Sequence, residues 1–261
     1  MENQLLDSDM LDNKEGKSLS SLLANGYETN SVEYIKKGFE LFKQNIGPFI
    51  GFIIVVGIAE GIIGSIPFIK GLASALVAPI VAGGFLVAKM IDKNEQHAFS
   101  NFFDGIQNYV PLFLVTLLPT LLIGAIFLIV GGWAYFKMAF LGITPKLDFQ
   151  DLNSLSSFAS MAGFGMRASL AGIISGVISI LFLLATFLVL FEKFEPVKAL
   201  DISRKLVGKK FFNWFGFLFL IGIFNIAGAL CLLVGLFVTI PSSICALYVA
   251  YEDVVGLNLR D

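Results

Sequence analysis

The sequence predicts an all-α polytopic integral membrane protein, a bundle of six transmembrane helices. The first observation is that residues 211–251 contain no Asp, Glu, Lys, Arg or His. One helix of that length would measure about 60 Å, twice the roughly 30 Å core of a bilayer, so the stretch must cross, turn near 232–235 and cross back. The second is composition, since 56% of residues are hydrophobic and 15% charged, against about 25% charged in soluble domains.

Six apolar windows are long enough to span a membrane. They cover 48–68, 71–91, 110–134, 168–191, 211–231 and 236–254. Their Leu, Ile, Phe and Val runs lack the polar alternation of a transmembrane barrel, and open sheet edges cannot face lipid, so we predict helices. The 27 Phe residues suit positions that face lipid.

The distribution of basic residues predicts the orientation. If both termini share one side, fourteen of the 18 Lys and Arg residues lie there, and the others are Lys70, Lys137, Lys146 and Arg167. Cytoplasmic loops are enriched in Lys and Arg, so both termini are expected in the cytoplasm. We expect a disordered cytoplasmic tail over 1–30 without signal-peptide features, a membrane domain over 31–256 and a C-terminal tail over 257–261.

An amphipathic segment precedes each outward crossing. These segments follow Asn30 and Gln96 or begin at Pro196, with Asn30 placed as an N-cap and Pro196 in a first helical turn. The chain then divides into three units, each an interfacial elbow helix followed by a hairpin: 31–92, 97–191 and 195–254. Either this is a three-fold hairpin repeat, or three outward helices acquired similar lead-ins separately.

Two prolines occupy matching places in the first and last units. Pro79 and Pro241 each lie about ten residues before the cytoplasmic end of a returning helix. A proline removes one backbone hydrogen bond of a helix and bends it. We therefore predict helix kinks at both positions.

Glu60 is the most informative ionisable residue within a crossing. Inserting a carboxylate at that depth of the membrane costs at least ~2.5 kcal/mol. We therefore expect Glu60 to face the protein interior, find a partner or stay protonated. One interpretation is proton or cation coupling in a small transporter. The other is a structural carboxyl bonded to Asn225, Thr120 or a basic residue, and the absence of a second intramembrane carboxylate or histidine favours it.

Small residues at four-residue spacing indicate close helix packing. Gly57 and Gly61 form one such pair, and Gly172 and Gly176 form another. This spacing lets two helix backbones approach. Packing within one bundle is favoured over a dimer face.

A basic cluster surrounds the approach to the fifth crossing. Its members are Lys193, Lys198, Arg204, Lys205, Lys209 and Lys210. Near a membrane each would attract anionic headgroups by about 1 kcal/mol. The same cluster also explains the orientation of the fifth helix, so both roles remain open.

Motifs for catalysis are missing from the sequence. We find no metal-binding His-Glu-x-x-His, nucleophile elbow, Walker loop or paired intramembrane carboxylate. The lone His97 lacks partners at zinc-ligand spacing. We therefore expect no enzyme activity, cofactor or metal, and the net charge of −2 argues against nucleic-acid binding.

Three segments resemble a known group of proteins: FFDGIQNYVPLFLVTLL, EPVKALDISRKLVGKKFFNWFGFLFLIGI and VGLFVTIPSSICALYVAYEDVVG. They look like an uncharacterised family of six-helix bacterial membrane proteins, related to the membrane domain of some glycerophosphodiester phosphodiesterases. The matching positions are Ser203, Arg204, Lys205, Gly235, Thr239, Pro241, Ala250 and Tyr251. The resemblance implies a multi-pass protein of the bacterial inner membrane and carries over no catalytic residue.

The sequence thus favours a non-enzymatic accessory or lipid-associated membrane component. Its expected partners are membrane lipids and a protein partner in the membrane. The alternative is a small transporter or ion-coupled permease that uses Glu60.

Overall fold

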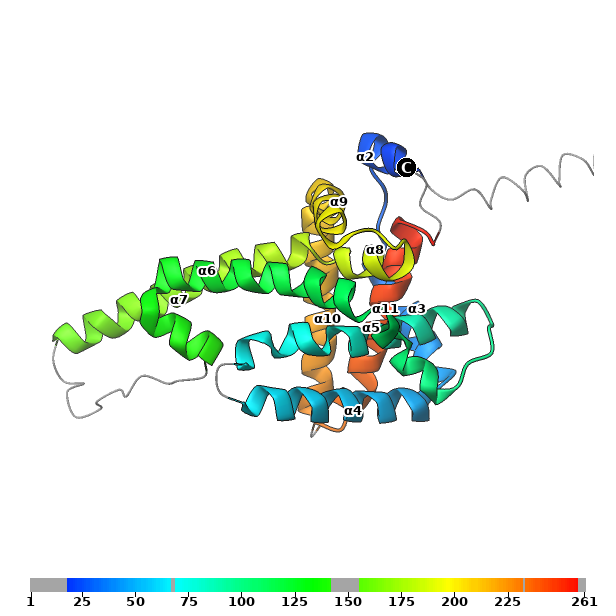
Figure 1. Ribbon diagram of the computed structural model, residues 1–261, viewed down its shortest axis with the longest axis horizontal. Helices are drawn as coiled ribbons and strands as arrows, with labels where there is room; N and C mark the ends of the chain where they lie inside the picture. The colour runs from blue at the N-terminus through cyan, green and yellow to red at the C-terminus, as the bar shows by residue number, and fades with distance from the viewer. Residues whose placement is uncertain (1–17, 67–68, 142–154, 232, 258–261) are drawn as a thin grey trace, which may run out of the picture.

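The computed structural model describes residues 18–66, 69–141, 155–231 and 233–257. Every regular element in these residues is a helix (Figure 1), which confirms the all-α prediction. Five helical segments are long and apolar enough to cross a membrane: Ile46–Ser65, Lys70–Asp92, Phe99–Val130, Gly165–Phe191 and Phe211–Leu230. The predicted C-terminal tail, apart from residue 257, lies outside the described residues.

The first unit consists of α3 (Ser31–Lys43), α4 (Ile46–Ser65), η1 (Lys70–Leu72) and α5 (Ala73–Asp92). The predicted N-cap is confirmed, because the Asn30 side chain accepts a hydrogen bond from the Glu33 N–H at 3.3 Å. Glu33 also pairs with Lys37 at 3.0 Å, one turn further along the helix. Pro79 lies inside α5 and is buried.

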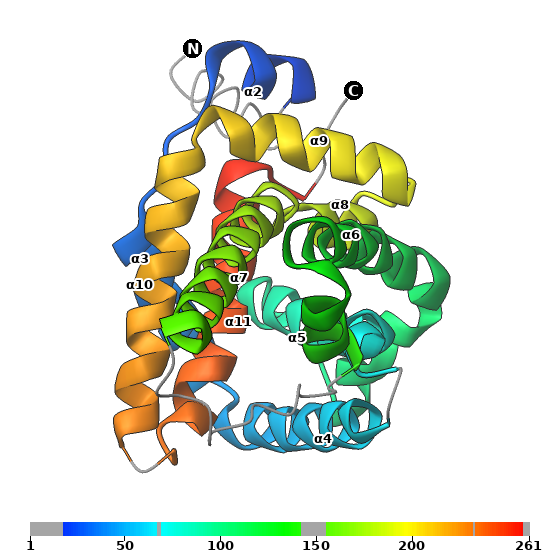
Figure 2. The ribbon, with the colours of Figure 1, turned by 90° about the vertical axis from the view of Figure 1, so that its left-hand side faces the viewer.

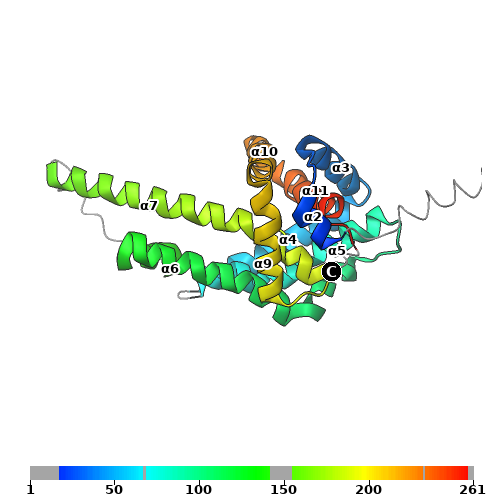
Figure 3. The same ribbon diagram turned by 90° about the horizontal axis from the view of Figure 1, so that it is seen from above.

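The second unit consists of η2 (Phe99–Asn108), α6 (Tyr109–Leu141), α7 (Leu155–Leu181) and α8 (Ala185–Phe191). The backbone of α6 is interrupted at Gly132, whose φ of +70° is not helical. In Figures 1 and 3 the paired helices α6 and α7 extend well away from the other helices. Their outer ends therefore contact few other parts of the described chain.

The third unit consists of α9 (Pro196–Lys209), α10 (Phe211–Leu230) and α11 (Leu236–Val254). Pro196 occupies the first turn of α9, as predicted. The turn of the α10–α11 hairpin falls at the predicted place, and a Cβ added to Gly228 would lie 2.5 Å from Thr239 Oγ1. In Figures 1 and 2 this hairpin runs crosswise to α4. The described helices therefore do not all share one axis.

The sixth predicted crossing, α11, is the central helix of the core. Twelve of its 19 residues are buried, and α3, α4, α5 and α10 pack around it. It is not among the five candidate spans, and it carries the buried hydroxyl residues Thr239, Ser242 and Ser243 as well as Glu252 and Asp253 near its end. Ser242 and Ser243 donate to carbonyls four residues earlier, at 2.6 and 2.7 Å. Because its surroundings are protein, α11 can carry these groups, and six spans are not confirmed.

Part of the phenylalanine enrichment fills the protein core. Phe42, Phe49, Phe52 and Phe102 are each exposed by 1% or less. The Phe52 ring stacks on Phe102 with centroids 4.7 Å apart, and Phe49 meets Phe102 edge to face at 5.0 Å. Such ring pairs add stability beyond their buried area. Lipid solvation therefore accounts for only some of these residues.

The three amphipathic lead-ins place only part of their apolar faces against protein, since Val32, Phe99 and Ile106 are exposed. The segment α3 buries Tyr34, Gly38, Leu41 and Phe42 and packs along α11, η2 packs against α5, and α9 packs against α6, α7 and α8. The first and third are α-helices, whereas η2 is a 3₁₀ helix. Neither the interfacial elbows nor the repeat is therefore confirmed.

Residues 18–30 differ from the predicted disordered tail. They contain α2 (Leu19–Asn25), which contacts α9. Leu22 is exposed by only 6%, and Tyr27 is joined by hydrogen bonds to Leu206 and Trp214. These contacts order a segment whose composition alone indicates no structure.

Candidate functional site

Among the functional residues predicted from the sequence, the six of the basic cluster form the most extended charged surface. The α9 helix turns Ala199, Ile202, Leu206 and three further residues inward. All six predicted basic residues are exposed: Lys193, Lys198, Arg204, Lys205, Lys209 and Lys210. We call these six residues the basic surface. Since most apolar residues of α9 face protein and Val197 alone of the large ones is exposed, the side open to a ligand is mainly charged.

An acidic side chain on α9 orients two members of the basic surface. Asp201 pairs with Arg204 at 2.9 Å and with Lys205 at 2.5 Å. The hydrogen bonds from Lys205 and Arg204 hold the pKa of Asp201 below its usual value. These pairs are solvent-exposed, so they contribute little stability and leave both cations accessible.

Ser203 anchors α9 to the break between α7 and α8. It is fully buried, donates its hydroxyl hydrogen to the Leu181 carbonyl at 2.8 Å and accepts from the Leu184 N–H at 3.1 Å. Both backbone groups lie where the α7 hydrogen-bond ladder ends, so they need partners. Ser203 thereby fixes the basic surface relative to the second hairpin.

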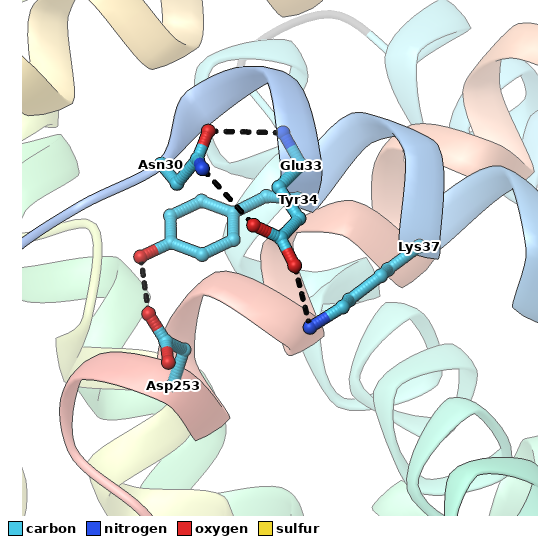
Figure 4. Close-up of polar contacts among 5 residues, drawn as sticks. All are labelled: Asn30, Glu33, Tyr34, Lys37 and Asp253. Carbon is cyan, nitrogen blue, oxygen red and sulfur yellow. Dashed lines mark hydrogen bonds and ion pairs between the residues drawn. The ribbon is translucent and has the colours of Figure 1, made fainter.

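A polar cavity of about 310 Å³ lies where α3, the end of α5 and the end of α11 meet. Five carboxylates line it: Glu33, Glu40, Asp92, Glu252 and Asp253. Figure 4 shows the Tyr34 hydroxyl donating to Asp253 at 2.5 Å and Lys37 beside Glu33. Burial and the hydrogen bond to Asp253 raise the pKa of Tyr34 above its ordinary value, so the phenol keeps its proton.

Each of these carboxylates already has a partner. Besides the pairs in Figure 4, Lys93 bridges Asp92 at 3.1 Å and Glu252 at 2.8 Å. Glu40 pairs with Lys43 at 2.7 Å. The network joins three helices that are distant in sequence. We interpret it as a structural network of hydrogen bonds and ion pairs that holds α3 and the ends of α5 and α11 together.

Glu60 does not face the protein interior, although an inward position was one of the three outcomes expected of its charge. It lies on an exposed part of α4, and no hydrogen bond or ion pair joins it to the described residues. The residues lining the polar cavity do not include Glu60. The reason is that α4 packs through Phe49, Phe52 and Val56, which leaves the neighbouring face, including Glu60, uncovered.

The two suggested partners of Glu60 bond elsewhere. The Thr120 hydroxyl donates to the Thr116 carbonyl at 2.8 Å within α6. Asn225 donates to the Ile221 carbonyl at 2.9 Å and to Ser243 on α11 at 3.0 Å. Asn225 thus links α10 to α11, as expected of an interhelical hydrogen bond.

The predicted packing glycines are open, whereas other glycines make the close contacts. A Cβ added to Gly57, Gly61, Gly172 or Gly176 would meet no described atom within 4 Å. Backbone atoms would instead obstruct a Cβ at other positions: Gly38, Gly83, Gly105 and Gly235. The preference for packing of the first four within one chain is therefore wrong for the described structure.

Sequence reasoning missed Tyr27 and its contacts. The Trp214 indole N–H donates to the Tyr27 hydroxyl at 2.7 Å, and that hydroxyl donates to the Leu206 carbonyl at 2.8 Å. Burial raises the pKa of Tyr27, which keeps its hydroxyl protonated. The contacts join residues that are 179 and 187 positions apart, so no local pattern signals them.

A metal centre has no support in the part of the chain that is described, where no three His, Cys, Asp or Glu side chains gather as ligands. The predicted surface histidine, His97, is exposed and lies 3.0 Å from Asn45 Nδ2. Comparison of the chain with protein-family models, curated proteins and solved structures finds no match. Functional inference therefore depends on the sequence and the geometry.

Proposed function

We propose that this protein is a non-enzymatic, lipid-associated accessory component of a membrane, and that its basic surface holds anionic headgroups. The observation that carries the proposal is the division of α9 into two sides. Most of its apolar residues are buried in protein, Val197 is exposed, and the six basic residues are exposed. Contact with lipid is thus mainly electrostatic, because Val197 is the one large apolar residue among the exposed residues of α9.

Neutralising the basic surface should remove bound anionic lipid. We expect the variant with all six residues changed to Gln to lose roughly tenfold or more of its preference for phosphatidylglycerol over phosphatidylcholine, since each cation near a headgroup contributes about 1 kcal/mol. The measurement is mass spectrometry of lipids retained in nanodiscs of mixed composition. Nanodiscs expose both membrane faces, so protein orientation does not affect the result.

The matched control replaces the five lysines of this surface with Arg. This change keeps the charge, so the preference for anionic lipid should survive. If the Gln variant retained as much phosphatidylglycerol as the unaltered protein, the basic surface would serve orientation only, and the proposed function would fail.

We propose further that the chain crosses the bacterial inner membrane six times, with both termini in the cytoplasm. The basic-residue distribution supports the orientation. The uncharged residues 211–251 and the tight turn between α10 and α11 support a crossing hairpin. The residues resembling a six-helix bacterial family, including Ser203 and Thr239, support the location.

A native cysteine tests this topology. Cys231 is exposed at the α10–α11 turn, whereas Cys245 is buried in α11. In the six-crossing topology a membrane-impermeant maleimide added to intact spheroplasts should label Cys231, and Cys231→Ser should abolish the signal. Labelling only after lysis would show that the hairpin does not reach the outer side.

The transporter alternative loses support from the position of Glu60. A coupling carboxylate needs a polar path through the protein, yet the polar cavity lies between α3, α5 and α11 and is not lined by Glu60. We therefore assign Glu60 no role in transport. A partner in the membrane remains part of the proposal, because it would cover the open side of α4.

A further inference from the structure

The segment 18–29, which we call the strap, lies against the junction between α9 and α10. Figure 2 shows α2 above α9 at this end of the molecule. Leu22 is buried there, and Thr29 accepts a hydrogen bond from Asn213 at 2.8 Å. The strap therefore contacts the same junction that carries Lys209 and Lys210.

The strap donates a hydrogen bond to a carbonyl near the end of α9, and α9 donates one to a carbonyl near the end of α2. The last carbonyls of a helix lack partners within it. Tyr27 donates to one such carbonyl of α9, that of Leu206. In return Lys209 Nζ donates to the Ala24 carbonyl, in the last turn of α2, at 3.4 Å. The docked strap thus engages one cation of the basic surface.

A second cation lies beside the strap. Gly26 has a φ of +77°, and a Cβ at this position would be 3.9 Å from Cε of Lys210. The Lys210 side chain therefore passes close to the strap backbone at its turn. The docked strap thus holds the Lys209 ammonium and lies near the Lys210 side chain, whereas Lys198, Arg204 and Lys205 lie closer to the start of α9.

We propose that the strap is a releasable regulator of the basic surface, which competes with anionic headgroups for Lys209. This inference rests on the proposed lipid-binding function. A headgroup and the Ala24 carbonyl then compete for the same Lys209 ammonium. By thermodynamic reciprocity, anionic lipid must loosen the strap as much as strap release strengthens lipid binding.

The test uses the Tyr27→Phe variant of the full chain. Loss of the hydroxyl leaves Leu206 without its donor and the Trp214 N–H, whose side chain is 1% exposed, without its acceptor. We expect binding of phosphatidylglycerol nanodiscs to rise by about fivefold through the release of Lys209. Hydrogen exchange of residues 19–27 should also be faster in phosphatidylglycerol than in phosphatidylcholine nanodiscs for the unaltered protein.

Tyr109→Phe is the matched control, because the Tyr109 hydroxyl makes an exposed 3.4 Å contact with Leu76 away from α9. It should change neither measurement. Asn213→Ala removes only the surface contact with Thr29 and provides a second releasing variant if Tyr27→Phe does not fold. Its lipid binding should also rise.

The outcomes separate the two proposals. If neutralising the basic surface reduces lipid binding but strap exchange is the same in both lipids, lipid binding stands and the strap is not a regulator. Weaker or unchanged lipid binding after Tyr27→Phe and Asn213→Ala overturns the inference in the same way. If neutralisation itself has no effect, the proposed function fails and the strap has nothing to regulate.

Discussion

Replacing Gly83 with Ala should destabilise the protein by about 3 kcal/mol or more, the upper end of the cost of overpacking a core. A Cβ at Gly83 would lie 1.7 Å from the Phe102 carbonyl oxygen and 2.4 Å from its carbon. These are backbone atoms of η2, and Phe102 is held by Phe49 and Phe52. The obstruction therefore cannot be relieved by a change of rotamer. Thermal unfolding in detergent, followed by tryptophan fluorescence, measures the loss.

The control is Gly61→Ala on α4. No described atom lies within 4 Å of its added Cβ, and alanine favours a helix over glycine by about 0.5–1 kcal/mol. We expect stability to stay the same or to rise slightly. Equal melting temperatures for the two variants would contradict the close approach of α5 and η2.

Gly38→Ala should cause the second large loss, again about 3 kcal/mol. Its Cβ would lie 2.4 Å from the Ala246 nitrogen, 2.6 Å from its Cα and 2.7 Å from its Cβ. The change forces α3 away from α11, so it should also weaken the Tyr34–Asp253 hydrogen bond. The same unfolding measurement applies, with Gly47→Ala as control, since Gly47 is open.

A double variant sharpens this prediction. Combining Gly38→Ala with Ala246→Gly removes one clashing side chain but leaves the nearer backbone nitrogen and Cα in place. The double variant should therefore recover only a minor part of the lost stability. Full recovery would show that the two helix backbones are further apart than the structure has them.

Local patterns predicted much of the secondary structure. The N-cap at Asn30, the place of Pro196 in the first turn of α9 and the helices within the six apolar windows depend on residues close in sequence. The structure has them, except that the fourth window is divided between α7 and α8. Exposure of the basic surface was also predictable, because Lys and Arg side chains are rarely buried. These features need no knowledge of which helices become neighbours.

Contacts between distant segments were not predictable in this way. The same Gly-x-x-x-Gly pattern occurs whether or not another helix covers it, so Gly57 and Gly61 resembled packing positions although Gly38 and Gly83 make the contacts. An inward position was one outcome expected of Glu60 for its charge, yet α4 packs through its neighbouring face. The strap was expected to be disordered from its composition. The residues that order it, Leu206 and Trp214, are nearly two hundred positions away, so no local pattern signals them.

The sequence by itself determined that this protein is helical and rich enough in apolar segments for a membrane, because periodicity, caps and hydropathy act over one or two helical turns. The tertiary structure alone decided that α11 is the core, that α9 buries most of its apolar residues and exposes its basic ones, and that the strap reaches Lys209. Those outcomes depend on which surfaces meet, and close packing between helices is set by shape across the whole chain.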